Sequence, residues 1–206
     1  MDFEARAGEV AFVTGPTAAG KSTLMHVLRL ALLPQTGQAI ILGEDVQRLN
    51  LGRRAKLKRR VGYIAETPVF VEDWSAFDNI AMALRLAGRR PKTFADDVEE
   101  LTEFVGFDDD IRQPVRALSN AARRRVAIAR ALAGKPELIL ADDPTSGVSP
   151  EAGRRIVRLL AEMRRVGAAV VITSQDEGLA DYVHGIRWRM EHGRPVRVEE
   201  PAEADA

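Results

Sequence analysis

The stretch that most constrains this chain is residues 15–23, which read GPTAAGKST. Residues 10–14 before it are apolar and predict a buried strand, and residues 21–33 after it have apolar residues at helical spacing. Glycines let the backbone turn closely, so that successive N–H groups and the start of the helix can face a phosphate. A strand, a glycine-rich loop ending in Lys-Ser and a helix, in this order, predict a phosphate-binding loop.

The loop supplies the candidate nucleotide contacts. They are Gly15, Pro16, Thr17, Ala18, Ala19, Gly20, Lys21, Ser22 and Thr23. We expect Lys21 to reach the β- and γ-phosphates of ATP and the Ser22 hydroxyl to bind Mg²⁺. The plainer alternative, a Gly/Ala turn leading into a helix, is disfavoured because the flanking strand and helix are the context that the motif requires.

Composition limits the remaining classes of function. A chain of 206 residues that is 46% hydrophobic suits one globular domain with a small inserted subdomain. Lys and Arg number 30, as do Asp and Glu, so the bulk charge predicts no nucleic-acid partner. The sequence has no cysteine, no apolar run of membrane-spanning length and an acidic start unlike a signal peptide. These features predict a cytoplasmic protein that reaches the inner face of a membrane only through a partner.

Strand and helix patterns alternate along most of the chain. This alternation predicts an α/β fold with a mostly parallel sheet, whose ligands bind at the carboxyl ends of the strands. The helix of residues 21–33 is expected to end at Pro34, and residues 53–60 to form a solvated basic helix face. Further elements are expected at residues 61–65 (strand), 138–141 (strand), 151–165 (helix), 168–173 (strand), 177–183 (short helix), 186–190 (strand) and 195–198 (strand).

One part of the chain breaks the alternation. Residues 67–133 carry helical patterns rich in surface charge and predict a helical subdomain inserted in the α/β core. The core would then consist of residues 1–66 and 134–198. The acidic tail, residues 199–206, is expected to be disordered.

A second site motif follows the apolar run of residues 138–141, which ends in Asp142 and Asp143. We expect this strand to lie directly beside the strand of the phosphate loop. Asp142 would then hold Mg²⁺ through water, and Asp143 would orient or deprotonate an attacking water. Ordinary loop acids are the alternative, which the phosphate loop disfavours.

With these motifs in this order, the sequence resembles the ATP-binding-cassette (ABC) ATPases, a class of phosphate-loop NTPases. Residues 118–122 (LSNAA) and 125–132 resemble the signature motif and its helix, and residues 141–146 resemble the acidic strand end. Residues 61–66 lie where the family has its glutamine loop, and residues 171–176 where it has its histidine switch. The resemblance covers nearly the whole chain and implies an ABC-type nucleotide-binding domain.

Within the family the sequence is most similar to the cell-division type, FtsE, on residues 8–15 and 45–49 and on its shortness. The resemblance implies an ATP-binding subunit that pairs with itself or with another ABC ATPase, so that Ser119 of one subunit closes over ATP in the other. It also implies an FtsX-like integral membrane protein as partner, docked near the glutamine loop. The expected output is control of cell division or cell-wall remodelling.

The departures from the family concentrate on the chemistry. Asp143 stands where the family has a catalytic glutamate, Gln175 replaces the switch histidine, and Glu66 replaces the loop glutamine. These three are the catalytic candidates, and Glu66 joins Ser22 and Asp142 as a candidate Mg²⁺ ligand. The Asp143 side chain is shorter than glutamate by one C–C bond, roughly 1.5 Å, which predicts slow turnover.

Other differences lie around the site. Asn120 and Ala121 replace signature glycines, and Ser149 replaces an aspartate that communicates across the family's dimer. Ala18 replaces another loop glycine. Family members also carry strands and an adenine-stacking aromatic well before the loop, which the short segment here does not supply, and Phe3 is expected in the core of the first strand. Either the start is truncated, or adenine is held weakly.

Three functions remain open from the sequence. The first is a slow ABC ATPase coupled to a membrane partner. The second is a non-hydrolysing nucleotide-binding scaffold, or one subunit of a heterodimeric ABC transporter. The third is a phosphate-loop kinase or DNA-repair ATPase, against which the signature helix and the neutral charge argue.

Overall fold

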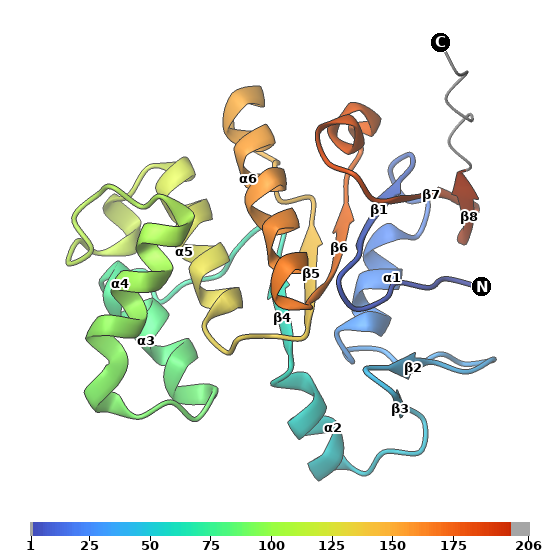
Figure 1. Cartoon of the computed structure of the whole chain (residues 1–206), viewed down its shortest axis with the longest axis horizontal. Helices are drawn as coiled ribbons and strands as arrows, with labels where there is room; N and C mark the ends of the chain where they lie inside the picture. The colour runs from blue at the N-terminus through green and yellow to red at the C-terminus, as the bar shows by residue number, and fades with distance from the viewer. Residues whose placement is uncertain (1, 199–206) are drawn as a thin grey trace.

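A six-stranded sheet forms the centre of the molecule (Figure 1), a computed structural model that describes residues 2–198. Its strand order is β4-β5-β6-β1-β7-β8, and every neighbouring pair is parallel except the antiparallel pair of β7 and β8. The strands are β1 (Val10–Thr14), β4 (Val61–Ile64), β5 (Leu138–Asp142), β6 (Ala169–Thr173), β7 (Ile186–Glu191) and β8 (Arg194–Val198). The mostly parallel sheet is therefore confirmed.

The prediction that the strand ending in Asp142 lies directly beside the strand of the phosphate loop is wrong. β6 lies between β1 and β5, because Val170 pairs with Val10 on one side and with Ile139 on the other. Both β5 and β6 are buried along their whole length, so hydrophobicity alone does not distinguish which of them is central. The consequence for the site is that Thr173, the last residue of β6, stands between the phosphate loop and Asp142.

The two faces of the sheet carry separate apolar cores. Alternate strand residues point to opposite faces, which divides each strand between the cores. On one face, residues of α1 (Lys21–Leu28) pack with Ala11, Val13 and Val171. On the other, residues of α6 (Pro150–Glu162) pack with Phe12 and Ile172. The helices that follow β1 and β5 thus pack on opposite faces of the sheet.

Several helix ends differ from the predicted ones. The first helix ends at Leu28 and not at Pro34, because Leu30 takes a left-handed φ of 62° that stops the helix within a tight turn. The helix expected over residues 151–165 gives way to a 3₁₀ turn at Met163–Val166. The short helix expected at 177–183 is a 3₁₀ helix, Glu177–Tyr182.

The start of the chain differs too. Phe3 lies outside any strand and is half-buried, with its ring tilted by 53° against that of Trp188 of β7 at 5.1 Å between centroids. The expectation that Phe3 belongs to the first strand is therefore wrong. The short strands β2 (Ile40–Ile41) and β3 (Glu44–Asp45) pair as a separate antiparallel hairpin. The helix α2 (Leu51–Lys58) follows them and contains most of the basic segment, residues 53–60, that was predicted to be helical.

Three helices gather beyond the β4 edge of the sheet (Figure 1). They are α3 (Ala76–Leu86), α4 (Phe94–Val105) and α5 (Asn120–Leu132), and α5 packs on both other helices and on β4. Gly62 permits this approach, because a Cβ there would lie 2.5 Å from the Ala131 carbonyl oxygen. All three helices lie within residues 67–133, where helical patterns were predicted.

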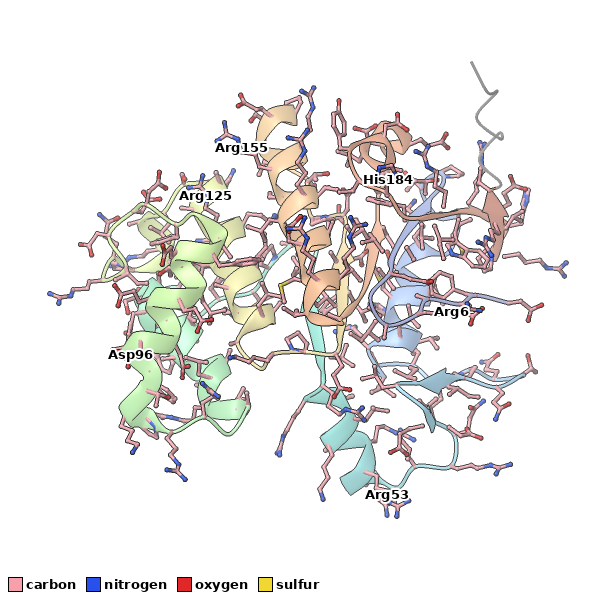
Figure 2. The ribbon with its side chains drawn as sticks, in the orientation of Figure 1. Arg6, Arg53, Asp96, Arg125, Arg155 and His184 are labelled. Carbon is pink, nitrogen blue, oxygen red and sulfur yellow. The ribbon has the colours of Figure 1, made fainter. Side chains whose placement is uncertain are left out.

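Charged side chains of both signs cover the outside of the molecule, as the labelled Arg6, Asp96 and Arg155 illustrate (Figure 2). Within residues 2–198, none of the helices combines the length and the hydrophobicity that crossing a membrane requires. The prediction of a disordered acidic tail concerns residues 199–206, which lie outside the described residues.

Candidate functional site

The phosphate-loop motif follows β1 and leads into α1. Gly15 and Gly20 take φ values of 139° and 106°, which disfavour side chains, and a Cβ on Gly15 would lie 2.7 Å from the Met190 carbonyl oxygen. Gly20 caps α1 without a side-chain hydrogen bond. The first N–H groups of α1 therefore have no capping side chain in front of them, which is the arrangement that favours an anion.

Lys21 folds back over this loop. Its Nζ donates to the carbonyl oxygens of Gly15, at 2.6 Å, and Pro16, at 2.9 Å. The ammonium group thus lies within the bend of the backbone, where it can meet a bound phosphate. Ser22 and Thr23 follow on the exposed side of the first helical turn.

The predicted switch residue lies beside the loop. Thr17 Oγ1 donates a hydrogen bond to Gln175 Oε1 at 3.2 Å. Gln175 comes two residues after the end of β6, and β6 is the direct neighbour of β1. Strand pairing therefore places the side-chain amide next to the phosphate loop.

Two hydrogen bonds hold Asp142 at the end of β5, where its side chain is almost fully buried. Thr173 Oγ1 donates to Oδ1 at 2.7 Å, and the Tyr63 hydroxyl donates to Oδ2 at 3.3 Å. Burial, together with the nearby Asp142 charge, raises the pKa of Tyr63, which keeps the phenol protonated as a donor. Each carboxylate oxygen retains a further lone pair for a ligand.

Sequence reasoning missed Thr173 and Tyr63. The available signal was their position, since both lie on strands whose carboxyl ends meet at the edge where Asp142 was expected. This position identifies the two residues only when the strand order is known, and the sequence did not predict that β6 lies next to β5.

Asp143 occupies a constrained position. Its φ is 40°, a left-handed value that costs a non-glycine residue about 1–3 kcal/mol, and its N–H donates to the Thr173 carbonyl oxygen at 3.1 Å. Burial raises the pKa of the Asp143 carboxyl, and the charges of Glu66 and Asp142 raise it further, while Lys21 opposes them. Lys21, Glu66 and the two aspartates thus form one electrostatic group.

The residues brought together fit a magnesium ion that is shared with a nucleotide. Among residues 2–198 there is no group of three or more His, Asp or Glu placed to bind a metal by themselves. Mg²⁺ is commonly held by one or two protein carboxylates together with phosphate oxygens and water. Asp142 and Glu66 supply carboxylates and Ser22 a hydroxyl, which are donor types that such an ion accepts.

Ser119 is not brought to the loop of its own chain. It caps α5, where its Oγ accepts a hydrogen bond from the Ala122 N–H at 3.2 Å. The helix packs at the β4 edge, and β5 and β6 separate β4 from β1. Ser149 acts in the same way at α6, accepting from the Ala152 N–H at 3.3 Å. Ser119 therefore lies apart from the phosphate loop of its own chain.

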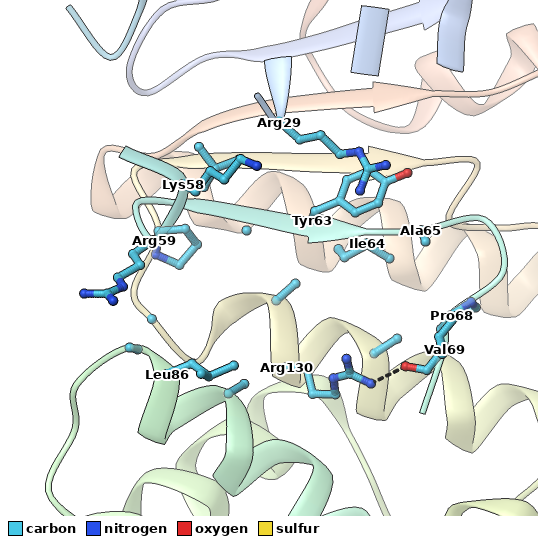
Figure 3. A pocket seen from close by; sticks show the side chains of 18 of the residues that line it. Arg29, Lys58, Arg59, Tyr63, Ile64, Ala65, Pro68, Val69, Leu86 and Arg130 are labelled. Atoms are coloured by element: carbon cyan, nitrogen blue, oxygen red, sulfur yellow. Dashed lines mark hydrogen bonds between the residues drawn. The ribbon is translucent and has the colours of Figure 1, made fainter. Parts of the chain in front are cut away.

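A groove with a volume of about 500 Å³ runs between β4 and the helices α3 and α5 (Figure 3). Lys58 and Arg59 stand at one end of it, and the Arg29 guanidinium lies 4.6 Å from the centroid of the Tyr63 ring. Arg130 donates to the Val69 carbonyl oxygen at 2.6 Å at the opposite end. The groove thus has an apolar floor, cationic residues at its ends and a direct contact with a residue that holds Asp142.

Comparison with known proteins shows the family of this chain. A family model described as ABC transporter matches residues 1–146. The lipoprotein-releasing system ATP-binding protein LolD of Shewanella sp. (strain MR-7) is 32% identical over 182 residues, which cover 87% of this chain and 79% of LolD. The cell division ATP-binding protein FtsE of Mycobacterium tuberculosis is 32% identical over 193 residues, which cover 94% of this chain and 84% of FtsE.

A solved structure shares the architecture. The ATP-binding cassette MJ0796, in a dimeric post-hydrolysis state bound to ADP and Pi, matches with a TM-score of 0.86 at 24% sequence identity. The match covers 96% of this chain and 89% of that chain. At this identity it establishes that the two chains have the same fold.

Proposed function

Because the chain belongs to the ABC transporter family, we propose that it binds ATP at residues 15–23 and hydrolyses it slowly. One observation carries the proposal: the Lys21 ammonium lies inside the loop bend and acts electrostatically on Asp143. The cation that would meet the phosphates and the acid that would meet the attacking water therefore face one space.

The side chains of the site have distinct tasks in this proposal. Lys21 and the uncapped N–H groups of α1 bind phosphate oxygens. Ser22 and Asp142 hold Mg²⁺, with Glu66 as a further ligand; when bound, the ion neutralises phosphate charge. Gln175 donates to the terminal phosphate from beside Thr17.

Asp143 is the proposed base that orients and deprotonates the attacking water. Because its pKa is raised, the pKa of the carboxyl lies closer to neutral pH, which favours proton transfer from water. Its reach is short by one C–C bond, roughly 1.5 Å, compared with glutamate. Since a positioned general base contributes about 10²- to 10⁴-fold, a carboxylate held back from the water accounts for slow turnover.

The remaining parts need other subunits. The solved MJ0796 cassette is a dimer, and Ser119 here caps an exposed helix start far from its own loop. We therefore propose a homo- or heterodimer with an ABC ATPase in which Ser119 approaches the partner's nucleotide. Residues 67–133 would form the subdomain that presents Ser119, and residues 1–66 with 134–198 the ATP-binding core.

A membrane partner completes the proposal. The groove beside β4 offers an apolar floor next to Tyr63, so a segment of an FtsX-like integral membrane protein is the proposed occupant. Such a partner would hold the complex at the inner face of the cell membrane. FtsE and LolD are equally identical to the chain, so cell division and lipoprotein release are both candidate roles. Co-purification with the membrane protein of each kind distinguishes them.

A second candidate function has its own support. Asp143 is short and takes a left-handed backbone conformation, and Gln175 cannot carry a proton. A chain that keeps the binding parts and has altered hydrolytic parts fits a nucleotide-binding scaffold, or the non-hydrolysing subunit of a heterodimer.

Steady-state ATP hydrolysis separates the two candidates. The variants are Lys21→Ala, Asp143→Glu and a matched control, Lys56→Ala, which removes an exposed lysine of α2 outside both the phosphate loop and the groove. The proposal expects measurable turnover in the wild type and the control, loss in Lys21→Ala, and faster turnover in Asp143→Glu. If the wild type turns over ATP no faster than Lys21→Ala, with and without the membrane partner, the ATPase proposal is wrong and the nucleotide-binding scaffold is the remaining candidate.

A further inference from the structure

Three consecutive arginines on α5 have different surroundings. Successive helix residues point about 100° apart, so Arg123, Arg124 and Arg125 cannot share a face. Arg123 pairs with Glu72 at 2.6 Å, and Arg125 pairs with Asp108 at 2.5 Å, both toward the surface. Arg124 is only 6% exposed. The basic run in the sequence thus contains one buried cation between two partly exposed ones.

Arg124 binds backbone rather than a carboxylate. Its Nη1 donates to the Ala65 carbonyl oxygen at 2.9 Å, and its Nη2 donates to those of Glu66, at 2.8 Å, and Ser146, at 3.0 Å. The acceptors belong to two segments, one after β4 and one after β5. A single guanidinium therefore ties both segments to α5.

Each tied segment carries a candidate site residue. The first is Glu66 itself. In the second, the Ser146 N–H donates to the Asp143 carbonyl oxygen at 3.1 Å, and Thr145 Oγ1 donates to Asp143 Oδ1 at 3.5 Å. The turn that contains Asp143 is thus closed at Ser146, the same residue that accepts from Arg124.

We propose that Arg124 is a positioning residue that couples the nucleotide site to the start of α5. It would hold the Glu66 and Asp143 segments in place and transmit their displacement to the helix whose first turn is capped by Ser119. This inference rests on the proposed ATP binding at residues 15–23. It adds a residue that contacts neither nucleotide nor attacking water.

The side-chain chemistry explains why arginine suits this position. A guanidinium presents five N–H donors in a rigid plane, which suits three carbonyl oxygens from two segments. Lysine keeps the charge but lacks the fork, and glutamine keeps two donors but loses the charge and reach. The two substitutions therefore remove different parts of the interaction.

Hydrogen–deuterium exchange of the full-length protein, with and without Mg-ATP, tests the coupling without requiring hydrolysis. The proteins are wild type, Arg124→Gln, Arg124→Lys and the matched control Arg125→Gln, whose partner Asp108 lies outside the segments that are followed. In wild type and Arg125→Gln, Mg-ATP should slow exchange at residues 15–23, 65–72 and 116–124. In Arg124→Gln, protection should persist at residues 15–23 and fall about fivefold or more at the other two segments. Arg124→Lys should be intermediate.

The outcomes are distinct. Absence of ATP protection at residues 15–23 in the wild type overturns both the proposed ATP binding and the coupling that rests on it. Protection there, with equal responses at 65–72 and 116–124 in wild type and Arg124→Gln, overturns the coupling alone. So does a wild type whose α5 segment does not respond. If circular dichroism shows that Arg124→Gln is unfolded, Arg124→Lys decides, and a wild-type response in that variant contradicts the role of the fork.

Discussion

Thr173→Val removes one hydroxyl group from the centre of the proposed site. The side chain is fully buried, its Oγ1 donates to Asp142 at 2.7 Å, and the same oxygen accepts from the Asp143 N–H at 3.2 Å. Valine has nearly the same shape, so no cavity contributes. A hydrogen bond to a charged group is worth about 1.5–3 kcal/mol, and removing it leaves a nearly buried carboxylate with only the Tyr63 bond.

The expected loss of unfolding free energy is therefore about 1.5–3 kcal/mol, or a fall in Tm of about 3–12 °C for a protein of this size. Thr102→Val is the matched control. Thr102 is also buried, but its Oγ1 donates to the Val98 and Glu99 carbonyl oxygens of its own helix, so the cost should stay below about 1 kcal/mol.

Urea denaturation and Mg-ATP titration of the two variants measure both effects. Thr173→Val should be the less stable and should bind Mg-ATP more weakly, because the Asp142 carboxylate is no longer fixed. If Thr173→Val and Thr102→Val are equally stable and bind Mg-ATP equally well, the hydrogen bond does not organise the site, and the reasoning is refuted.

Two further predictions concern α5 packing and pH. Gly62→Ala should cost about 1–3 kcal/mol in denaturation, because its Cβ would lie 2.5 Å from the Ala131 carbonyl oxygen, whereas Gly52→Ala in α2 meets only Asn50 Oδ1 at 3.6 Å and should be neutral or stabilising. Equal stability of the two would contradict the close approach of α5. The rate of hydrolysis should fall as the pH drops through the raised pKa of Asp143, since the base must be deprotonated. Glu66→Gln should move this acid limb to lower pH, because it removes a negative charge that raises the pKa of Asp143. If the acid limb of the pH–rate profile is the same in Glu66→Gln and the wild type, Asp143 is not the base of the reaction.

Much of the fold could be predicted because the signals are local. The phosphate loop lies within residues 15–23, and the ABC-type α/β fold that the sequence resembles is confirmed. Strand order was not accessible in the same way, since β5 and β6 are equally buried and either could neighbour β1. The end of α1 depends on a left-handed leucine, Leu30, which no residue preference indicates.

The site shows the same division. Lys21, Asp142 and Asp143 belong to short motifs and were identified as candidates from sequence. Their supports were not, because Thr173 and Tyr63 reach Asp142 only through strand pairing across the sheet. Arg124 was hidden for a related reason: three adjacent arginines look alike in sequence, and only tertiary packing buries one of them.

The most direct test of the central claim is equilibrium binding of Mg-ATP to the wild type, Lys21→Ala and Lys58→Ala by isothermal titration calorimetry. Charge-assisted hydrogen bonds of about 1.5–3 kcal/mol predict that Lys21→Ala binds roughly 10- to 150-fold more weakly than the wild type, while Lys58→Ala binds equally well. Equal affinity of the wild type and Lys21→Ala, or no binding by the wild type, would contradict the assignment of residues 15–23 as the nucleotide site.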